Sequence, residues 1–264
     1  MNCILERVAE TRSTNDDLLE RWRAGQLIDP VARIAHRQTA GKGRAGRTWF
    51  ASPEDSMCFS MAFPFQRSPA QLAGLSLVVG MAAISGIAQA CDLSEDALHQ
   101  AGLRLKWPND LLVNNTKVGG ILIEGGQATT HDRSWMIIGV GINLHYSKLI
   151  ETELGNQSPL KAGALDQILP KGKALPDIEY LWLKLISAFE QDLNAFDRLG
   201  FDPFQHRWER WDAYQGQTVC ISGAGKEAIY GVAKGIDQTG ALLLRQDAKT
   251  IAIHAGDVSL RVQS

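Results

Sequence analysis

The sequence has few of the features that mark secreted or metal-binding proteins. It contains 4 cysteines in 264 residues. Cys3, Cys58, Cys91 and Cys220 are widely separated and form no CxxC pair. This spacing predicts neither a zinc site nor a disulfide framework. We therefore expect free thiols in a reducing cytoplasm and no metal site formed by the chain itself.

The sequence also lacks long hydrophobic runs. No stretch reaches eighteen uninterrupted apolar residues, so a membrane-spanning helix is not expected. Residues 71–91 come closest, but their Ala, Gly and Ser content is typical of a tightly packed core helix. Near the N-terminus Glu6, Arg7 and Glu10 interrupt any apolar segment, and this pattern argues against a secretory signal.

No charge of one sign dominates the chain. It contains 27 Lys and Arg residues and 29 Asp and Glu residues, which gives a net charge of -2. The overall basic field of a nonspecific nucleic-acid binder is therefore missing. A hydrophobic content of 45% and a charged content of 21% are ordinary for a globular protein. The length permits one large domain or two smaller ones with a substantial core.

The first 212 residues predict a mixed α/β arrangement. Alternating and β-branched residues predict strands at 4–9, 31–35, 57–63, 103–107, 111–113, 118–124 and 135–143. Helices are predicted from Thr14, its expected N-cap, and over 69–91, 178–198 and 204–211. Pro64 is expected to end its strand, and residues 147–176 are interpreted as a loop region. The short connections favour a mostly antiparallel sheet.

The character of the sequence changes after Tyr214. Short strands at roughly regular spacing are predicted at 218–221, 228–236, 241–244 and 250–253, with glycine-bearing turns between them. This pattern is typical of a small β-barrel or sandwich. We therefore divide the chain near residue 213, into a domain over 1–212 and a second domain over 213–264.

One loop, Gly41 to Trp49, combines three glycines, three cations and an indole. Lys42, Arg44 and Arg47 place positive charge where backbone N–H groups can also face a phosphate or carboxylate. Trp49 offers a flat surface for an aromatic base or a cation. The spacing matches neither the P-loop nor GxGxxG. Taken alone, the segment is typical of a solvated basic loop.

Four other stretches carry chemically informative residues. They are Ser13-Thr14-Asn15, the segment Lys106 to Asp110 (KWPND), the segment Lys117 to Glu124 (KVGGILIE) and the segment Ile138 to Leu144. The last has alternate glycines in a predicted strand, which suggests that another group packs directly against the backbone. A bulge or a tight strand crossing explains those glycines equally well.

Together, in this order and spacing, these stretches resemble the biotin–protein ligase family. The glycine loop is close to the family signature GRGRxGRxW, and KWPND, K-x-G-G-I-L-x-E and G-x-G-I-N occupy their usual places. The segment Gly256 to Arg261 is similar to the family's final strand. The resemblance implies a catalytic domain like that of class II aminoacyl-tRNA synthetases, followed by an SH3-like β-barrel. It also implies formation of biotinyl-5′-AMP from biotin and MgATP, and transfer of biotin to a lysine of a biotin carboxyl carrier protein.

The resemblance also implies roles for individual residues. Biotin would contact Ser13, Thr14, Asn15, Gln38, Gly41, Lys42, Arg44, Lys117, Gly120, Gly139 and Gly141. The adenylate would contact Arg44, Arg47, Trp49, Asn143 and Arg261, with Trp49 covering the adenine. Lys117 and Arg44 would be catalytic, and Asp110 would orient or deprotonate the incoming lysine. Glu124 fits the family pattern, but we interpret it as a surface acid at a strand end.

Two departures from the family pattern bear on function. Lys42 stands where the family usually has Arg, so a point charge replaces a bidentate clamp. The first predicted strand begins almost at Met1, which leaves no room in this sequence for the DNA-binding module of the repressor members. We therefore expect no DNA binding. A free sheet edge could pair with a second copy, so a homodimer stays open.

Three alternatives stay open from the sequence. A lipoate or octanoyl transfer enzyme shares the architecture, although KWPND and the glycine loop speak against it. A noncatalytic biotin sensor belongs to a different class of protein. The presence of Lys117, Arg44 and Asn143 argues against a loss of catalysis. Nucleic-acid binding through residues 213–264 has little support, because that segment has no dense basic and aromatic patch.

Overall fold

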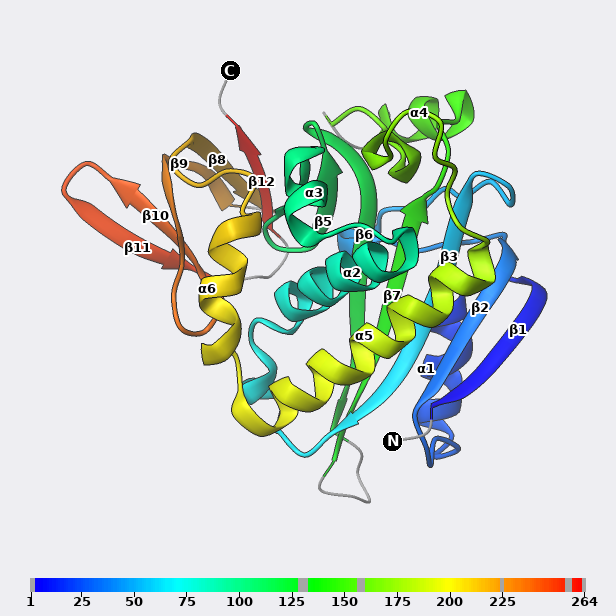
Figure 1. Ribbon diagram of the computed structural model, residues 1–264. Coiled ribbons are helices and arrows are strands. Elements are labelled where there is room, and N and C mark those ends of the chain that lie inside the picture. The colour runs from blue at the N-terminus through cyan, green and yellow to red at the C-terminus, as the bar shows by residue number, and fades with distance from the viewer. Residues whose placement is uncertain (1–2, 128–132, 156–159, 224–225, 255–257, 263–264) are drawn as a thin grey trace.

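The computed structural model describes residues 3–127, 133–155, 160–223, 226–254 and 258–262. Figure 1 shows a large, helix-covered sheet with a smaller β unit beside it. Among the described residues, no helix is long and apolar enough to cross a membrane.

The large sheet has seven strands in the order β1-β2-β3-β7-β6-β5-β4. Only β1 and β2 run parallel among its neighbouring pairs, so the predicted mostly antiparallel sheet is confirmed. The strands are β1 (Ile4–Thr11), β2 (Val31–Gln38), β3 (Ser56–Phe65), β4 (Leu103–Lys106), β5 (Asp110–Val113), β6 (Thr116–Gln127) and β7 (Ser134–Asn143).

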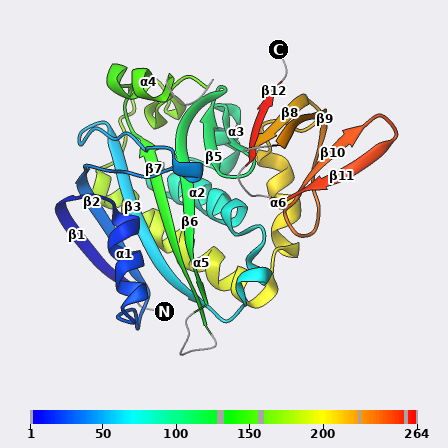
Figure 2. The same cartoon turned by 180° about the vertical axis from the view of Figure 1, so that it is seen from behind.

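Helices cover both faces of this sheet (Figures 1 and 2). Helices α2 (Leu75–Cys91) and α5 (Ile178–Leu199) pack over one face, and α1 (Thr14–Arg23) lies on the other. Side chains alternate along β7 accordingly. Ile138, Val140 and Ile142 enter the large core, whereas Trp135 and Ile137 pack with α1. By the same alternation, the backbone at 139 and 141 faces the α1 side.

The second sheet has five strands in the order β11-β10-β9-β8-β12. They are β8 (Thr218–Gly223), β9 (Lys226–Ile236), β10 (Leu242–Gln246), β11 (Lys249–Ile253) and β12 (Val258–Val262). Helix α6 (Asp202–Trp211) leads into this sheet. The indole Nε1 of Trp107 donates to the carbonyl of Gly240 at 3.1 Å, and this bond ties the two units together. The division near residue 213 stays a prediction.

Two predicted boundaries in the first half were wrong. Strand β3 continues through Pro64 to Phe65, because its pairing with β2 ends at Ala62 and, among the described strands, β7 alone pairs with it there. A proline is tolerated where a strand has one free side. The helix predicted over 69–91 is split at Gly74, whose φ of +83° breaks it into a 3₁₀ turn (Pro69–Leu72) and α2.

Other local predictions also needed correction. The N-cap of α1 is Ser13, whose hydroxyl accepts from the N–H of Asp16, and not Thr14. The region predicted as a loop contains α4 (Lys148–Gly155) and a 3₁₀ turn at Leu165–Ile168, while residues 156–159 lie outside the described part. Helix α3 (Glu95–Gln100), capped by Ser94, was not predicted. Of the segment 256–261, residues 256 and 257 lie outside the described residues.

We predict that Gly86→Ala destabilises the protein. A Cβ at Gly86 would lie 2.8 Å from the Cα of Leu185 in α5, so the two helices must separate. Overpacking of this kind costs about 1–3 kcal/mol. Gly80→Ala in the same helix is the matched control, because its Cβ would meet flexible Leu105 methyl groups at 3.1 Å. Chemical unfolding should show a larger decrease in the free energy of unfolding for Gly86→Ala than for Gly80→Ala. Equal decreases would contradict the prediction.

Candidate active site

A cavity lies on the α1 side of the large sheet, enclosed by the N-terminus of α1, the glycine loop and strands β6 and β7. Most of the residues predicted for the site line it. These are Ser13, Thr14, Asn15, Gln38, Lys42, Arg44, Arg47, Trp49, Asp110, Lys117, Gly120, Gly139 and Gly141. Segments distant in the sequence therefore meet at one place.

The glycine loop is a compact hairpin. Lys42 and Thr48 form an antiparallel bridge, and the N–H of Gly43 donates to the carbonyl of Arg47 at 2.7 Å. Ala45 and Gly46, with φ of 54° and 71°, form the tip. Lys42 pairs with Asp16 in the first turn of α1, so this cation anchors the loop to the helix.

Two glycine positions are filled by the protein's own side chains. A Cβ at Gly141 would lie 2.2 Å from Cε2 of Trp49, and one at Gly139 would lie 2.4 Å from Oδ1 of Asn15. Gly41 does not line the cavity; a Cβ there would lie 2.5 Å from the carbonyl oxygen of Trp49. The glycines admit Trp49 and Asn15 to the strand surface. The predicted contacts of biotin with these glycines stay predictions.

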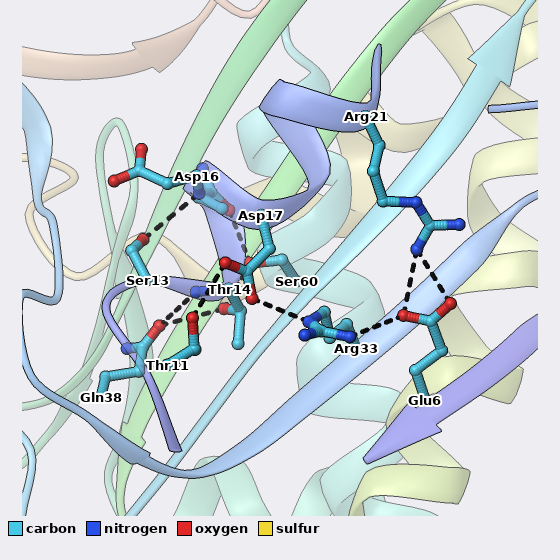
Figure 3. Close-up of polar contacts among 11 residues, drawn as sticks. Glu6, Thr11, Ser13, Thr14, Asp16, Asp17, Arg21, Arg33, Gln38 and Ser60 are labelled. Atoms are coloured by element: carbon cyan, nitrogen blue, oxygen red, sulfur yellow. Dashed lines mark hydrogen bonds and ion pairs between the residues drawn. The ribbon is translucent and has the colours of Figure 1, made fainter. Parts of the chain in front are cut away.

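Polar side chains line the α1 end of the cavity (Figure 3). Thr14 donates its backbone N–H to Oε1 of Gln38 at 2.8 Å, and its hydroxyl lies 2.7 Å from that of Ser60. Ser60 in turn donates to Oδ1 of Asn15 at 2.6 Å. Ser60 was not predicted, because a single serine in a hydrophobic strand carries no recognisable signal.

Glu124 is not the surface acid that we expected. It is half-buried, lies within β6 with the strand continuing to Gln127, and accepts a hydrogen bond from Nδ2 of Asn15 at 2.8 Å. The prediction failed because the sequence contains no information about which helix covers this part of the strand. Glu124 does not line the cavity itself.

A buried charge cluster forms the opposite wall. Asp110 accepts from Nζ of Lys117 at 2.7 Å and from Nζ of Lys106 at 2.9 Å. Burial alone would raise the pKa of the Asp110 carboxyl, but the two lysine charges and their hydrogen bonds hold it well below its usual range. Arg44 donates to Oδ1 of Asn109 at 2.9 Å and so lies beside this cluster.

Asn143 is buried in a smaller adjoining cavity lined by Thr48, Trp49, Phe50, Lys117, Ile150 and Leu154. Its Nδ2 donates to the carbonyl of Gly163 at 3.1 Å. Within the described part of the chain its Oδ1 has no hydrogen-bond partner. An aromatic wall with a buried free acceptor fits a nucleobase or ribose with donors to offer.

Arg261 is not brought to either cavity. It is exposed on β12 in the second sheet, opposite Cys220 of β8. Its predicted contact with the adenylate stays a prediction.

A charged network fastens α1 to the sheet beside the cavity (Figure 3). Arg33 of β2 donates to Asp17 of α1 at 2.8 Å and to Glu6 of β1 at 2.9 Å. Glu6 also accepts from Arg21 at the other end of α1. These contacts hold the helix N-terminus, and with it Ser13 and Thr14, over the site.

The site therefore has two chemically distinct ends. Hydroxyls and amides at the α1 end are suited to a small polar ring, whereas Arg44 and Lys117 at the other end are suited to anions. Such an arrangement can hold a carboxylate and a phosphate close together and offset their repulsion.

Comparison with known proteins supports this interpretation. Residues 8–143 match the Biotin/lipoate A/B protein ligase family, and residues 215–261 match the Biotin protein ligase C terminal domain. The chain is 34% identical to the "Bifunctional ligase/repressor BirA" of Salmonella typhimurium, over 94% of this chain and 72% of that protein. It is 32% identical to the "Biotin--[acetyl-CoA-carboxylase] ligase" of Mycobacterium tuberculosis, over 96% of this chain and 88% of that protein.

A solved structure is similar over nearly the whole chain. The biotin protein ligase from Aquifex aeolicus in complex with biotin and ATP has a TM-score of 0.76 and 27% sequence identity to this chain. The similarity covers 98% of this chain and 99% of that one.

We predict a pH-dependent effect of Asp110→Asn on stability. The pKa of Asp110 is lower in the folded than in the unfolded state, so its ion pairs stabilise the fold above about pH 4. This stabilisation is lost as the pH falls toward the folded-state pKa. Removing the charge should cost about 3 kcal/mol at pH 7. Urea unfolding at pH values from 7 to 3 measures the free energy of unfolding of both proteins. The difference in this free energy between variant and wild type should shrink as the pH falls. A constant difference would contradict the lowered pKa of Asp110.

Proposed function

The chain belongs to the biotin/lipoate A/B protein ligase family, and on that premise we propose its reaction and the roles of its residues. It is a biotin–protein ligase that forms biotinyl-5′-AMP from biotin and ATP and attaches biotin to a carboxylase carrier protein. Its fold is a class II synthetase-like catalytic domain followed by a C-terminal β domain. The observation that carries the assignment is the cavity itself, with polar groups at one end and Arg44 and Lys117 at the other.

The first step joins two anions. An oxygen of the biotin carboxylate attacks the α-phosphorus of ATP, and pyrophosphate leaves. The carboxylate and the phosphates repel each other in water, so the step needs fixed positive charge in a partly closed site. We assign this role to Arg44 and Lys117, both of which line the cavity. Mg²⁺ enters as part of the MgATP substrate.

The second step is attack of a neutral lysine amine on the acyl carbon of the adenylate, with AMP as the leaving group. Asp110 is poorly suited to accept the amine's proton, because two ammonium groups hold its pKa low. Asp110 instead accepts from the enzyme's own Lys117 at 2.7 Å, and its predicted orientation of the incoming carrier lysine stays a prediction. We propose that Asp110 positions Lys117 and does not act as the general base.

The cavity and its smaller neighbour are assigned to the two substrates. We assign the polar ring of biotin to Ser13, Thr14 and Gln38, beside the N-terminus of α1. The adenine and ribose are assigned to the adjoining cavity, where Trp49 gives a flat wall and Asn143 a free buried acceptor.

The acceptor is proposed to be a specific lysine of a biotin carboxyl carrier protein, in a cytoplasmic setting. In the described part of the chain, strand β1 is an edge of the large sheet and pairs with β2 alone. Pairing of this edge with a second copy stays a prediction. The absence of DNA binding is likewise still a prediction.

The alternative functions are less well supported. A noncatalytic biotin sensor would not need Arg44 and Lys117 to line the same cavity as the polar ring site. The lipoate reaction shares the family, but two relatives at 32% and 30% identity are named as biotin–[acetyl-CoA-carboxylase] ligases.

The function is tested by incubating the pure protein with biotin, ATP and Mg²⁺, with and without a biotin carrier domain. Mass spectrometry should detect biotinyl-5′-AMP in both reactions and the mass of one biotin added to the carrier lysine in the second. Lipoate in place of biotin is the matched control. Biotin binding without either product would favour the sensor function.

We predict that Lys117→Ala lowers the rate of adenylate formation about 100-fold or more, the size expected for loss of a transition-state charge contact. Lys106→Met is the control, because Lys106 shares Asp110 as its partner but does not line the cavity. Both variants should have a similarly lowered free energy of unfolding. Only Lys117→Ala should show a strongly reduced rate of pyrophosphate release. Equal activity losses would show that the charge cluster acts structurally.

A further inference from the structure

We propose that Glu124 is a positioning residue for biotin recognition, acting through Asn15. By fixing which end of the Asn15 amide faces the site, it sets the direction of a hydrogen-bond chain that ends at Thr14. The inference rests on the proposed function, because the ligand at that end is taken to be the cyclic urea of biotin.

Glu124 can reach Asn15 because of where the two residues lie. Asn15 occupies the first turn of α1 and is 3% exposed. Glu124 lies on β6, on the same side as Gly120 and Leu122, which line the cavity. The missing side chain at Gly139 of β7 leaves the space in which the Asn15 amide sits, since a Cβ would lie 2.4 Å from its Oδ1.

The carboxylate removes the ambiguity of the amide. An ionised carboxylate can only accept hydrogen bonds, so the Nδ2 end of Asn15 must face Glu124, at 2.8 Å. The Oδ1 end then faces Ser60 and accepts its hydroxyl hydrogen at 2.6 Å. Without Glu124 the amide could turn over and present N–H groups to Ser60 instead.

The donor–acceptor direction of the hydrogen-bond chain is carried from Asn15 through Ser60 to Thr14. A serine hydroxyl has one hydrogen, and here Asn15 accepts it, so Ser60 can only accept from the Thr14 hydroxyl at 2.7 Å. Oε1 of Gln38, 3.1 Å from the Thr14 hydroxyl oxygen, is a second acceptor for the same hydrogen. Both acceptors belong to the protein, so Thr14 donates into the protein and its oxygen lone pairs are left for the cavity. A urea ring has N–H donors that require such an acceptor. Glu124 therefore makes the site an acceptor for a urea N–H without touching biotin.

The test measures biotin affinity in the full-length protein by calorimetry, with ATP absent, and then adenylate kinetics. Glu124→Ala should weaken biotin binding about 10-fold or more, the effect expected for a hydrogen bond to a charged group. KM for ATP and kcat should change less than about two-fold. Glu124→Gln should keep most of the wild-type affinity for biotin, because the glutamine amide oxygen can still accept a hydrogen bond from Asn15.

A second pair of variants tests the direction of the chain. Asn15→Asp places a carboxylate against Glu124 and should weaken biotin binding more than Glu124→Ala does. Adding Glu124→Gln to Asn15→Asp should recover affinity, since the glutamine can donate to the new carboxylate. Additive losses in the double variant would contradict the proposed contact.

The matched control is Glu6→Ala. Glu6 also joins the sheet to α1, through Arg21 and Arg33, but does not contact Asn15. If Glu6→Ala weakens biotin binding as much as Glu124→Ala, Glu124 merely anchors the helix and the proposal is wrong. An unchanged biotin affinity in Glu124→Ala also overturns it while leaving the ligase function intact. A wild-type protein that forms no adenylate would instead refute the function itself.

Discussion

The close approach of the α1 N-terminus and the glycine loop to strand β7 is the constraint on which the site depends. Asn15 and Trp49 lie directly on the backbone at Gly139 and Gly141, where any Cβ would come within 2.4 Å of them. A helix end and a loop separated by many residues can share one cavity only because the strand surface is flat there. The hydrophobic cluster that contains Leu18 of α1 and Ile137 of β7 holds α1 in that position, together with the ion pairs of Arg33.

The second requirement is a source of fixed charge on the opposite wall. Asp110 lies between Lys106 and Lys117, and the three groups are largely shielded from water. The two ammonium groups hold the pKa of the Asp110 carboxyl low, so it stays ionised and can hold the Lys117 side chain in place at the cavity. The same arrangement that supports adenylate formation makes Asp110 a poor proton acceptor. The ion pairs through which Asp110 holds Lys117 in place are thus the same contacts that make its carboxylate a weak base.

Much of the site could be predicted, because its residues occur in short ordered motifs. The five predicted stretches together contain most of the residues that line the cavity, and their order along the chain indicates that they act together. They are Ser13-Thr14-Asn15, the glycine loop, KWPND, KVGGILIE and the segment Ile138 to Leu144. Ser60 and Glu124 were missed or misinterpreted, since their roles depend on α1 lying across β3, β6 and β7. The Gly74 break and the continuation of β3 through Pro64 were missed for a related reason: each depends on the neighbours of the segment.

The sequence by itself determined the family, the two-part fold and most of the residues that line the cavity, because these residues lie in local motifs whose order and spacing can be recognised along the chain. Only the tertiary structure decided what fills the glycine positions, that Lys42 pairs with Asp16, and that Glu124 faces Asn15. These contacts join segments up to 109 residues apart. Pairings over such separations follow from helix and strand packing, which no local pattern encodes.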